Sequence, residues 1–227
     1  MRLLCVTDLH GRTGRLAQII KAAGPVDAIA FGGDITDFGS PGEAEQIIRQ
    51  AQQACVAVFA VAGNCDSAQI DQRLLELGVS LCGRGTICGS MGIHGLSAMP
   101  PWKPGMFQLT EAELARLLAA GYEQLAAAQQ APGSAFAHHV VLTHVPPRDT
   151  RLDRTIFGNH VGSAALRAFI EQKQPALVIC GHIHEGRGIE QIGKTVVVNC
   201  GRAAAGEYAI AELDPTVNVA LHVAYRE

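Results

Sequence analysis

The sequence predicts an α/β fold in which two β-sheets pack together and helices cover the outside. Three observations lead to this prediction. Short apolar runs alternate with amphipathic segments near the start of the chain, the alternation returns after residue 139, and a row of short β segments follows it. The chain has 227 residues, and 48% of them are hydrophobic, which is enough for one domain with a substantial core. We therefore expect residues 1–227 to form a single domain.

The first 66 residues alternate between two patterns. Three short apolar runs are typical of strands buried on both faces, and they lie at residues 3–7, 28–31 and 56–61. The segments between them, 13–23 and 42–54, space their apolar residues three and four apart, as amphipathic helices do. This alternation predicts parallel strands joined by right-handed crossovers. Ser67 is the expected N-cap of a third helix, which ends before Gly78.

The pattern changes between residues 79 and 130. Short glycine-rich β segments at 79–96 indicate a meander or hairpins. The stretch 97–108 holds three prolines and the single tryptophan, Trp102, so it cannot be regular structure. Two interpretations of it remain open, a lid or contact loop over a site and an ordinary packed surface loop. A helix is expected from about 110 to 130, because Thr110 and Glu113 fit the capping-box pattern.

In the second half of the chain, predicted strands again alternate with a predicted helix, and the last segments are predicted to be strands only. Residues 140–143 and 177–180 have the pattern of buried strands, and residues 163–172 lie between them with the pattern of a helix. Four further segments are expected to be antiparallel strands, at residues 189–192, 196–199, 208–213 and 217–223.

Composition argues against several classes of protein. The formal net charge is −3 and there is no long basic run, so a general nucleic-acid-binding surface is not expected. No stretch of about 20 apolar residues could span a membrane, and the first apolar run is too short for a secretory signal. Seven cysteines without a CxxC motif are expected to be reduced thiols in a cytoplasmic protein. A homo-oligomer is left open.

Polar side chains follow five of the predicted strands. They are Asp8 and His10, then Asp34, then Asn64, Cys65 and Asp66, then His144, and finally His182 and His184. Because ligands bind at the carboxyl ends of strands in α/β sheets, these side chains are expected to meet at one edge. Oxygen and imidazole ligands suit manganese, iron, zinc or similar ions. Each pair alone is compatible with a turn or a solvated histidine, whereas the ordered combination is much more specific.

The ordered motifs resemble those of the calcineurin-like metallophosphoesterase superfamily. They are Asp8-x-His10, Gly33-Asp34, Gly63-Asn64, Thr143-His144 and Gly181-His182-x-His184. The run 160–185 is similar to the Icc-related bacterial and archaeal phosphoesterases. The resemblance implies a four-layer α/β/β/α sandwich of two mixed sheets flanked by helices. It also implies hydrolysis of a phosphate ester by a metal-bound hydroxide at a dinuclear centre.

The resemblance also implies a ligand set. Asp8, His10 and His184 would hold the first metal ion, Asn64, His144 and His182 would hold the second, and Asp34 would bridge both. Two divalent ions are expected, manganese ahead of iron, zinc, nickel or magnesium. Two ions, two aspartates and a hydroxide leave about one positive charge by formal counting. That charge slightly favours a phosphodiester, which is a monoanion, over a monoester.

The sequence departs from the family at Cys65. Most members have a histidine there, which donates a proton to the leaving group and is often oriented by the following acid, here Asp66. A thiol makes only weak hydrogen bonds. The implied catalytic residues are therefore Asn64, Cys65 and Asp66, with weak assistance to the leaving group. We expect activated aryl phosphodiesters to be cleaved more readily than alkyl phosphates.

Two of the remaining polar residues have two open interpretations each. Arg148 either contacts a substrate phosphate or is an ordinary surface arginine, and His160 either reaches the pocket or belongs to a loop before a helix. Glu185 is a candidate for orienting a metal ligand through a hydrogen bond, without binding the metal itself. His94 and the pair His138-His139 are expected to be structural.

Three functions remain open at this level. The first is an enzyme acting on a small, nucleotide-like phosphate ester, without membrane or general nucleic-acid partners. The second is a non-catalytic scaffold, because a eukaryotic relative in membrane-trafficking coats uses this fold for protein contacts. The third is a nuclease subunit. The presence of all seven implied ligand positions favours the enzyme.

Overall fold

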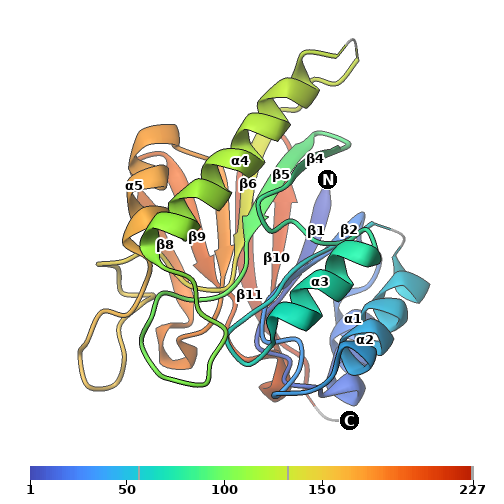
Figure 1. The fold of residues 1–227 in the computed structure, drawn as a ribbon. Helices are drawn as coiled ribbons and strands as arrows, with labels where there is room; N and C mark the ends of the chain where they lie inside the picture. The colour runs from blue at the N-terminus through green and yellow to red at the C-terminus, as the bar shows by residue number, and fades with distance from the viewer. Residues whose placement is uncertain (56, 132, 226–227) are drawn as a thin grey trace.

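Two β-sheets pack face to face in this protein, and helices cover the outer face of each (Figure 1). The computed structural model describes residues 1–55, 57–131 and 133–225. The first sheet has the strand order β11-β10-β1-β2-β3, and the second has the order β4-β5-β6-β7-β9-β8. Both sheets mix parallel and antiparallel pairs. The predicted four-layer α/β/β/α sandwich is confirmed.

The elements have the following bounds. The strands are β1 (Arg2–Val6), β2 (Ala28–Gly32), β3 (Val58–Val61), β4 (Gly85–Cys88), β5 (Met91–Leu96), β6 (His138–Thr143), β7 (Leu177–Cys180), β8 (Gly188–Ile192), β9 (Thr195–Asn199), β10 (Glu207–Leu213) and β11 (Val217–Val223). The α-helices are α1 (Thr13–Ala23), α2 (Pro41–Ala54), α3 (Ala68–Glu76), α4 (Glu111–Gln129) and α5 (Ala164–Lys173). Two short 3₁₀ turns are η1 (His184–Gly186) and η2 (Ala203–Ala205). Among the described residues, no helix is both long and apolar enough to cross a bilayer.

Three apolar layers hold the four structural layers together. Successive residues of β1 point to opposite faces, so Leu3 lies in the core between the sheets while Leu4 lies in the core beneath α1, α2 and α3. A third core joins the second sheet to α4 and α5, where Val141 packs in the same cluster as Leu118. Because the central strands are covered on both faces, they appear in the sequence as continuous apolar runs.

Most predicted elements lie where the sequence placed them. Ser67 caps α3, and the predicted capping box of Thr110 and Glu113 begins α4. The strand predicted at residues 56–61 begins at Val58, and Ala57 precedes it outside the strand; position 56 lies outside the described residues. The four segments predicted to be antiparallel strands form the antiparallel pairs β8–β9 and β10–β11, and β9 has one further neighbour. The segment β9 runs antiparallel to β8 but parallel to β7, because a hairpin sends the chain back after β8 and places β9 beside β7.

The parallel strands explain why distant motifs meet. The strands β1, β2 and β3 are parallel neighbours in the first sheet, and β6 and β7 are parallel neighbours in the second. The loops after these five strands carry the polar motifs identified in the sequence. Backbone bonds join the loops to one another, for example from the Asp8 N–H to the Gly33 carbonyl at 3.0 Å and from the Gly181 N–H to the His144 carbonyl at 2.9 Å.

The buried His94 and the half-buried His139 form a pair on the outer side of the second sheet. Their Nε2 atoms lie 2.9 Å apart, and both rings pack against Tyr122 of α4 and Phe169 of α5. They therefore belong to the packing between sheet and helices, in line with the structural role expected for them. Burial lowers the pKa of His94 to about 3, with a smaller contribution from His139, and burial lowers the pKa of His139 to about 4.

This histidine pair should make the protein sensitive to acid. An unfolded histidine takes up a proton near pH 6.5, whereas the folded imidazoles stay neutral until about pH 3 to 4, so stability falls as the pH drops through this window. Each histidine then contributes a loss of about 1.4 kcal/mol per pH unit. Urea denaturation in EDTA at about pH 7 and about pH 5 should show a smaller acid loss for His139→Gln than for the parent or for His138→Gln. Equal losses in all three proteins would contradict this assignment.

Candidate metal centre

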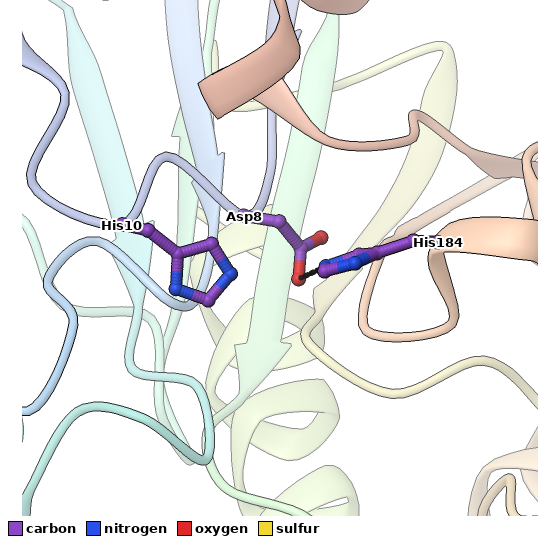
Figure 2. A group of neighbouring side chains, drawn as sticks. All are labelled: Asp8, His10 and His184. Atoms are coloured by element: carbon purple, nitrogen blue, oxygen red, sulfur yellow. Dashed lines mark hydrogen bonds and ion pairs between the residues drawn. The ribbon is translucent and has the colours of Figure 1, made fainter.

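Asp8, His10 and His184 form the first group of candidate metal ligands (Figure 2). One ligand atom from each lies within 4.8 Å of the others. The Nε2 atom of His184 is 3.3 Å from Oδ1 of Asp8, and the rings of His10 and His184 meet edge to face with centroids 5.8 Å apart. Asp8 is fully buried, and the backbone N–H of His182 donates to its Oδ2 at 3.0 Å. The carboxylate is thus fixed between two imidazoles.

Asp34 lies between two sets of ligands. Its Oδ2 is 3.8 Å from Nε2 of His10, and its Oδ1 is 3.5 Å from Nε2 of His144. The same Oδ1 accepts a hydrogen bond of 2.7 Å from the backbone N–H of Cys65. Asp34 also belongs to two candidate groups, one with His10 and Cys65 and the other with Asp8 and His144. One carboxylate therefore faces both halves of the site.

Asn64, His144 and His182 make up the other half. Nδ1 of His144 lies 3.0 Å from the Gly32 carbonyl, which can only accept, so we assign the imidazole proton to Nδ1. The Nε2 lone pair then faces Oδ1 of Asn64 at 2.8 Å. The Asn64 amide is oriented by donation from its Nδ2 to the sulfur of Met106 at 3.3 Å. Such a convergence of lone pairs requires a proton or a cation between them.

His182 adds a second sign of a missing positive partner. Its imidazole is packed against that of His144, with ring centroids 5.0 Å apart. Its Nε2 is buried and has no hydrogen-bond partner among the described residues. Burial, helped by the nearby His144, lowers the pKa of His182 to about 3, so this imidazole stays neutral. A buried neutral imidazole with a free nitrogen is suited to binding a metal ion.

The backbone at the ligands is unusual. Four candidate ligands have left-handed backbone conformations, namely Asp8 (φ 55°), His10 (φ 48°), Asp34 (φ 47°) and His182 (φ 68°). This conformation is uncommon for residues other than glycine and costs on the order of 1 kcal/mol each. Strain of this kind concentrates at functional sites, where the surrounding structure holds it in place. Its concentration on these loops favours a site that binds a ligand.

Charges in the site balance carboxylates against imidazoles. Burial alone would raise the pKa of Asp8, but the hydrogen bond from His184 and the charge of His144 hold it below its usual value. Burial would lower the pKa of His144, but the carboxylates of Asp34 and Asp8 raise it. The bond to Asp8 likewise raises the pKa of His184. Divalent cations would take the place of these imidazole protons.

Cys65 lies in the site as a neutral thiol. Burial, together with the charge of Asp34, raises the pKa of its Sγ far above the usual range, and the residue is buried. Nδ2 of Asn64 donates to the sulfur at 3.3 Å. The thiol is therefore close to the ligands but is a poor anion and a weak proton donor.

Asp66 does not orient Cys65 in the way that the family pattern implies. Its carboxylate accepts hydrogen bonds from the backbone N–H groups of Gly63 (2.8 Å), Ile35 (3.1 Å) and Thr36 (2.9 Å), and from the Thr36 hydroxyl (2.8 Å). Burial and the nearby Asp34 raise its pKa to about 6. These bonds tie the loop after β2 to the loop after β3. The geometry favours a positioning role for Asp66 over direct participation in catalysis.

Arg148, His160 and Glu185 bond to groups other than the candidate ligands. Nδ1 of His160 is 2.7 Å from the buried Asp153, and Glu185 accepts the backbone N–H of Ile156 at 2.8 Å. Arg148 is exposed, and its backbone N–H donates to the Ser163 carbonyl. In the described part of the chain, none of the three has a hydrogen bond or ion pair with a candidate ligand. Substrate contacts by Arg148 and His160 stay predictions.

The loop 97–108 contacts the second half of the site. The ring of Trp102 meets that of His182 edge-on, with centroids 6.0 Å apart, and the Phe107 N–H donates to the Asn64 carbonyl at 3.0 Å. Together with the Met106 contact described above, this favours the contact-loop interpretation over an ordinary surface loop.

A cavity of about 540 Å³ opens beside His10 and His184. Its other lining residues are Arg12, Arg15, Asp37, Arg202 and Ala204. The sequence motifs do not include these arginines. Arg12 and Arg15 follow the first motif closely enough to have been suspected, but Arg202 comes well after the last motif. A larger cavity of about 640 Å³ lies between α4 and α5 and contains no candidate ligand.

The fold and the candidate ligands agree with the metal-dependent phosphoester hydrolases, and a family comparison supports this class. Residues 1–186 match the family model of the calcineurin-like phosphoesterases, and the chain belongs to that family. The family is metal-dependent, and the described residues contain candidate ligand groups. The family that the sequence motifs indicated, the calcineurin-like metallophosphoesterases, is therefore confirmed.

Similar proteins cover nearly the whole chain. The uncharacterized protein MJ1162 of Methanocaldococcus jannaschii is 29% identical over 209 residues, which is 88% of this chain and 87% of that protein. The crystal structure of TT1561 of Thermus thermophilus matches with a TM-score of 0.74 and 18% identity over 99% of both chains. Another crystal structure matches with a TM-score of 0.80, also at 18% identity over 99% of both chains. At this identity the two structures show the fold alone.

Proposed function

We propose that this protein hydrolyses a phosphate ester, a diester in preference to a monoester, with two divalent metal ions. The proposed ligands are Asp8, His10 and His184 for one ion, Asn64, His144 and His182 for the other, and Asp34 for both. The observation that carries the proposal is the position of Asp34, whose two oxygens face His10 on one side and His144 on the other. A single carboxylate can bridge two metal ions only if its two oxygens face the two sets of ligands in this way.

The residues present fit two cations. The Nε2 of His182 has no hydrogen-bond partner in the described part of the chain, and the 2.8 Å contact between Nε2 of His144 and Oδ1 of Asn64 needs a proton or a cation. The donor set of nitrogen and oxygen atoms accepts several metals, and we propose manganese ahead of iron, zinc, nickel or magnesium. When bound, such a pair lowers the pKa of a water and offsets charge on the phosphoryl group.

The chain itself supplies binding and orientation. Asp8 and Asp34 are the only carboxylates among the seven proposed ligands, so the loaded site is positive and attracts an anion although the whole chain has a net charge of −3. Trp102 is 58% exposed beside His182 and offers a ring against which an aryl group or a nucleotide base can pack. These features support a small, nucleotide-like phosphate ester as substrate.

We propose that residues 1–227 act as one domain in the cytoplasm. The core between the sheets joins residues from both ends of the sequence, such as Cys5 and Val198, which supports a single folding unit. All seven cysteines are free thiols, which suits a reducing compartment.

The proposed function has a direct test. Protein loaded with manganese should contain two ions per chain and hydrolyse bis(p-nitrophenyl) phosphate faster than p-nitrophenyl phosphate, and EDTA should abolish both activities. Elemental analysis and release of p-nitrophenol measure these quantities. Tight binding of two ions without turnover of a panel of monoesters and diesters would overturn the enzyme and leave a metal-bearing scaffold.

The histidine exchange Cys65→His should widen the range of substrates. A protonated imidazole near the leaving oxygen can supply general-acid catalysis, typically worth about 100-fold or more. We expect the kcat for an alkyl phosphodiester to rise by at least about ten-fold, allowing for imperfect placement of the larger ring, while the rate with bis(p-nitrophenyl) phosphate changes little. The Cys65→Ala variant is the control for loss of the thiol alone. Unchanged alkyl-ester rates in Cys65→His would show that proton donation at this position is not limiting.

A further inference from the structure

The cavity beside the candidate metal centre has an unusual set of charges. Three guanidinium groups, those of Arg12, Arg15 and Arg202, line it together with a single carboxylate, that of Asp37. Asp37 is 67% exposed, and its Oδ1 lies 3.8 Å from Nδ1 of His10. The cavity is therefore strongly basic on a chain that is acidic as a whole.

These arginines differ from the paired arginines of the protein. Arg49, Arg73, Arg151, Arg167 and Arg187 each form an ion pair with a glutamate. Within residues 1–55, 57–131 and 133–225, no carboxylate forms an ion pair with the three cavity arginines. The Arg15 guanidinium donates to the neutral amide of Gln18, at 2.9 Å.

Arg202 shows why a nearby acid does not neutralise the cavity. The closest glutamate in sequence, Glu207, accepts the backbone N–H of Arg202 at 2.7 Å and pairs with the guanidinium of Arg187 at 3.7 Å. Its carboxylate is thus engaged by groups other than the Arg202 side chain. The guanidinium of Arg202 remains available to the cavity that it lines.

The start of α1 extends the basic region. A second cavity of about 520 Å³ shares Arg12 and Arg15 with the first and lies over Gly11, Thr13 and Gly14. The N-cap of α1 makes no side-chain hydrogen bond, and the first turn has no acidic residue. The partial positive charge of a helix start is therefore not offset here by a side chain. The two adjoining cavities, which share Arg12 and Arg15, are therefore both suited to binding an anion.

We propose that the Arg12, Arg15 and Arg202 cavity is an anion subsite that binds a second phosphate of the substrate. His10 and His184 line the same cavity and are proposed metal ligands, so an anion held by the arginines lies next to the group being hydrolysed. Guanidinium groups bind phosphate oxygens through paired, planar hydrogen bonds. The substrate class that fits is an ester of diphosphate, or a phosphate ester with a second phosphate close by. This inference rests on the proposed function for the identity of the reacting group.

Binding without metal tests the subsite separately from catalysis. Calorimetric titration of inorganic pyrophosphate into the protein in EDTA at about pH 8, where an ordinary histidine is neutral, should show binding to the parent. The double variant Arg12→Gln/Arg202→Gln should bind at least ten-fold more weakly. Arg116→Gln, an exposed arginine on α4, is the matched control and should bind as the parent does. The replaced side chains are exposed, so folding should be unaffected, and thermal melting checks this.

Activity then tests the substrate class. With manganese, we compare kcat/KM for UDP-glucose, a diphosphate diester, with kcat/KM for bis(p-nitrophenyl) phosphate, which has one phosphate. The ratio should fall at least ten-fold in the double variant and stay unchanged in Arg116→Gln. Equal pyrophosphate binding by parent and double variant would overturn the subsite even if the enzyme is active. Loss of pyrophosphate binding in the double variant, with no hydrolysis of any ester by the parent, would support the anion subsite and overturn the proposed function.

Discussion

Replacing Asp34 by asparagine should lower hydrolysis of bis(p-nitrophenyl) phosphate at least about a thousand-fold, equivalent to about 4 kcal/mol of transition-state stabilisation. The amide has nearly the same shape and can still accept the Cys65 N–H bond through its oxygen. It lacks the charge and the second anionic oxygen, which lies toward His10. We therefore expect the variant to fold and to lose at least one of the two metal ions. Elemental analysis, kcat with manganese and thermal melting measure the three quantities.

The control for this change is Asp149→Asn. Asp149 is exposed and, like Asp34, has a left-handed backbone, which asparagine tolerates. Its replacement removes the same charge from a loop without touching the candidate ligands, so metal content and kcat should match the parent. If Asp34→Asn kept two ions and parental kcat, the dinuclear centre proposed above would be wrong and only the fold assignment would survive.

The sequence could predict that the candidate ligands lie close together, because they follow buried parallel strands. Short apolar runs identify such strands. Asp8 follows β1 and His144 follows β6, and the packing of the two sheets places their carboxyl ends together although 136 positions separate the two residues. Helix starts could be predicted as well, since Thr110 and Glu113 form a local capping box that needs no tertiary information. These features depend on patterns that span only a few residues.

Other features depend on three-dimensional packing and leave no such pattern. The pairing of β9 is set by its hairpin with β8 and by its position beside β7. An apolar run in the sequence does not indicate whether a strand pairs parallel or antiparallel with its neighbour. Arg202 enters the basic cavity because the turn after β9 passes the first motif, where the Ala204 N–H donates to the Asp8 carbonyl. The bonding of Asp66 to backbone N–H groups also appears only once the two loops meet.

The second large effect is expected for Gly181→Ala, which adds one methyl group beside Asp8. A Cβ at this position would lie 2.1 Å from Oδ2 of Asp8 and 2.6 Å from Cβ of Thr7. Neither neighbour can move easily, because Asp8 is fully buried and the Thr7 hydroxyl donates to the Gly201 carbonyl at 2.6 Å. The methyl group must therefore displace the Asp8 carboxylate or the loop that carries His182 and His184.

We expect Gly181→Ala to lose the first metal ion, to lower kcat at least about a hundred-fold, equivalent to about 3 kcal/mol, and to reduce metal-free stability by about 1–3 kcal/mol through overpacking. Gly42→Ala in α2 is the matched control, because the nearest atom to its new Cβ is the Ser40 hydroxyl at 3.8 Å. That variant should keep both ions and gain about 0.4–1 kcal/mol, because alanine restricts the unfolded chain more than glycine does. A Gly181→Ala protein with two ions and parental kcat would mean that the Asp8 carboxylate does not need its observed position. The space that the Asp8 carboxylate occupies thus requires glycine at position 181. The motif Gly-His-x-His therefore reflects a packing requirement as well as two candidate ligands.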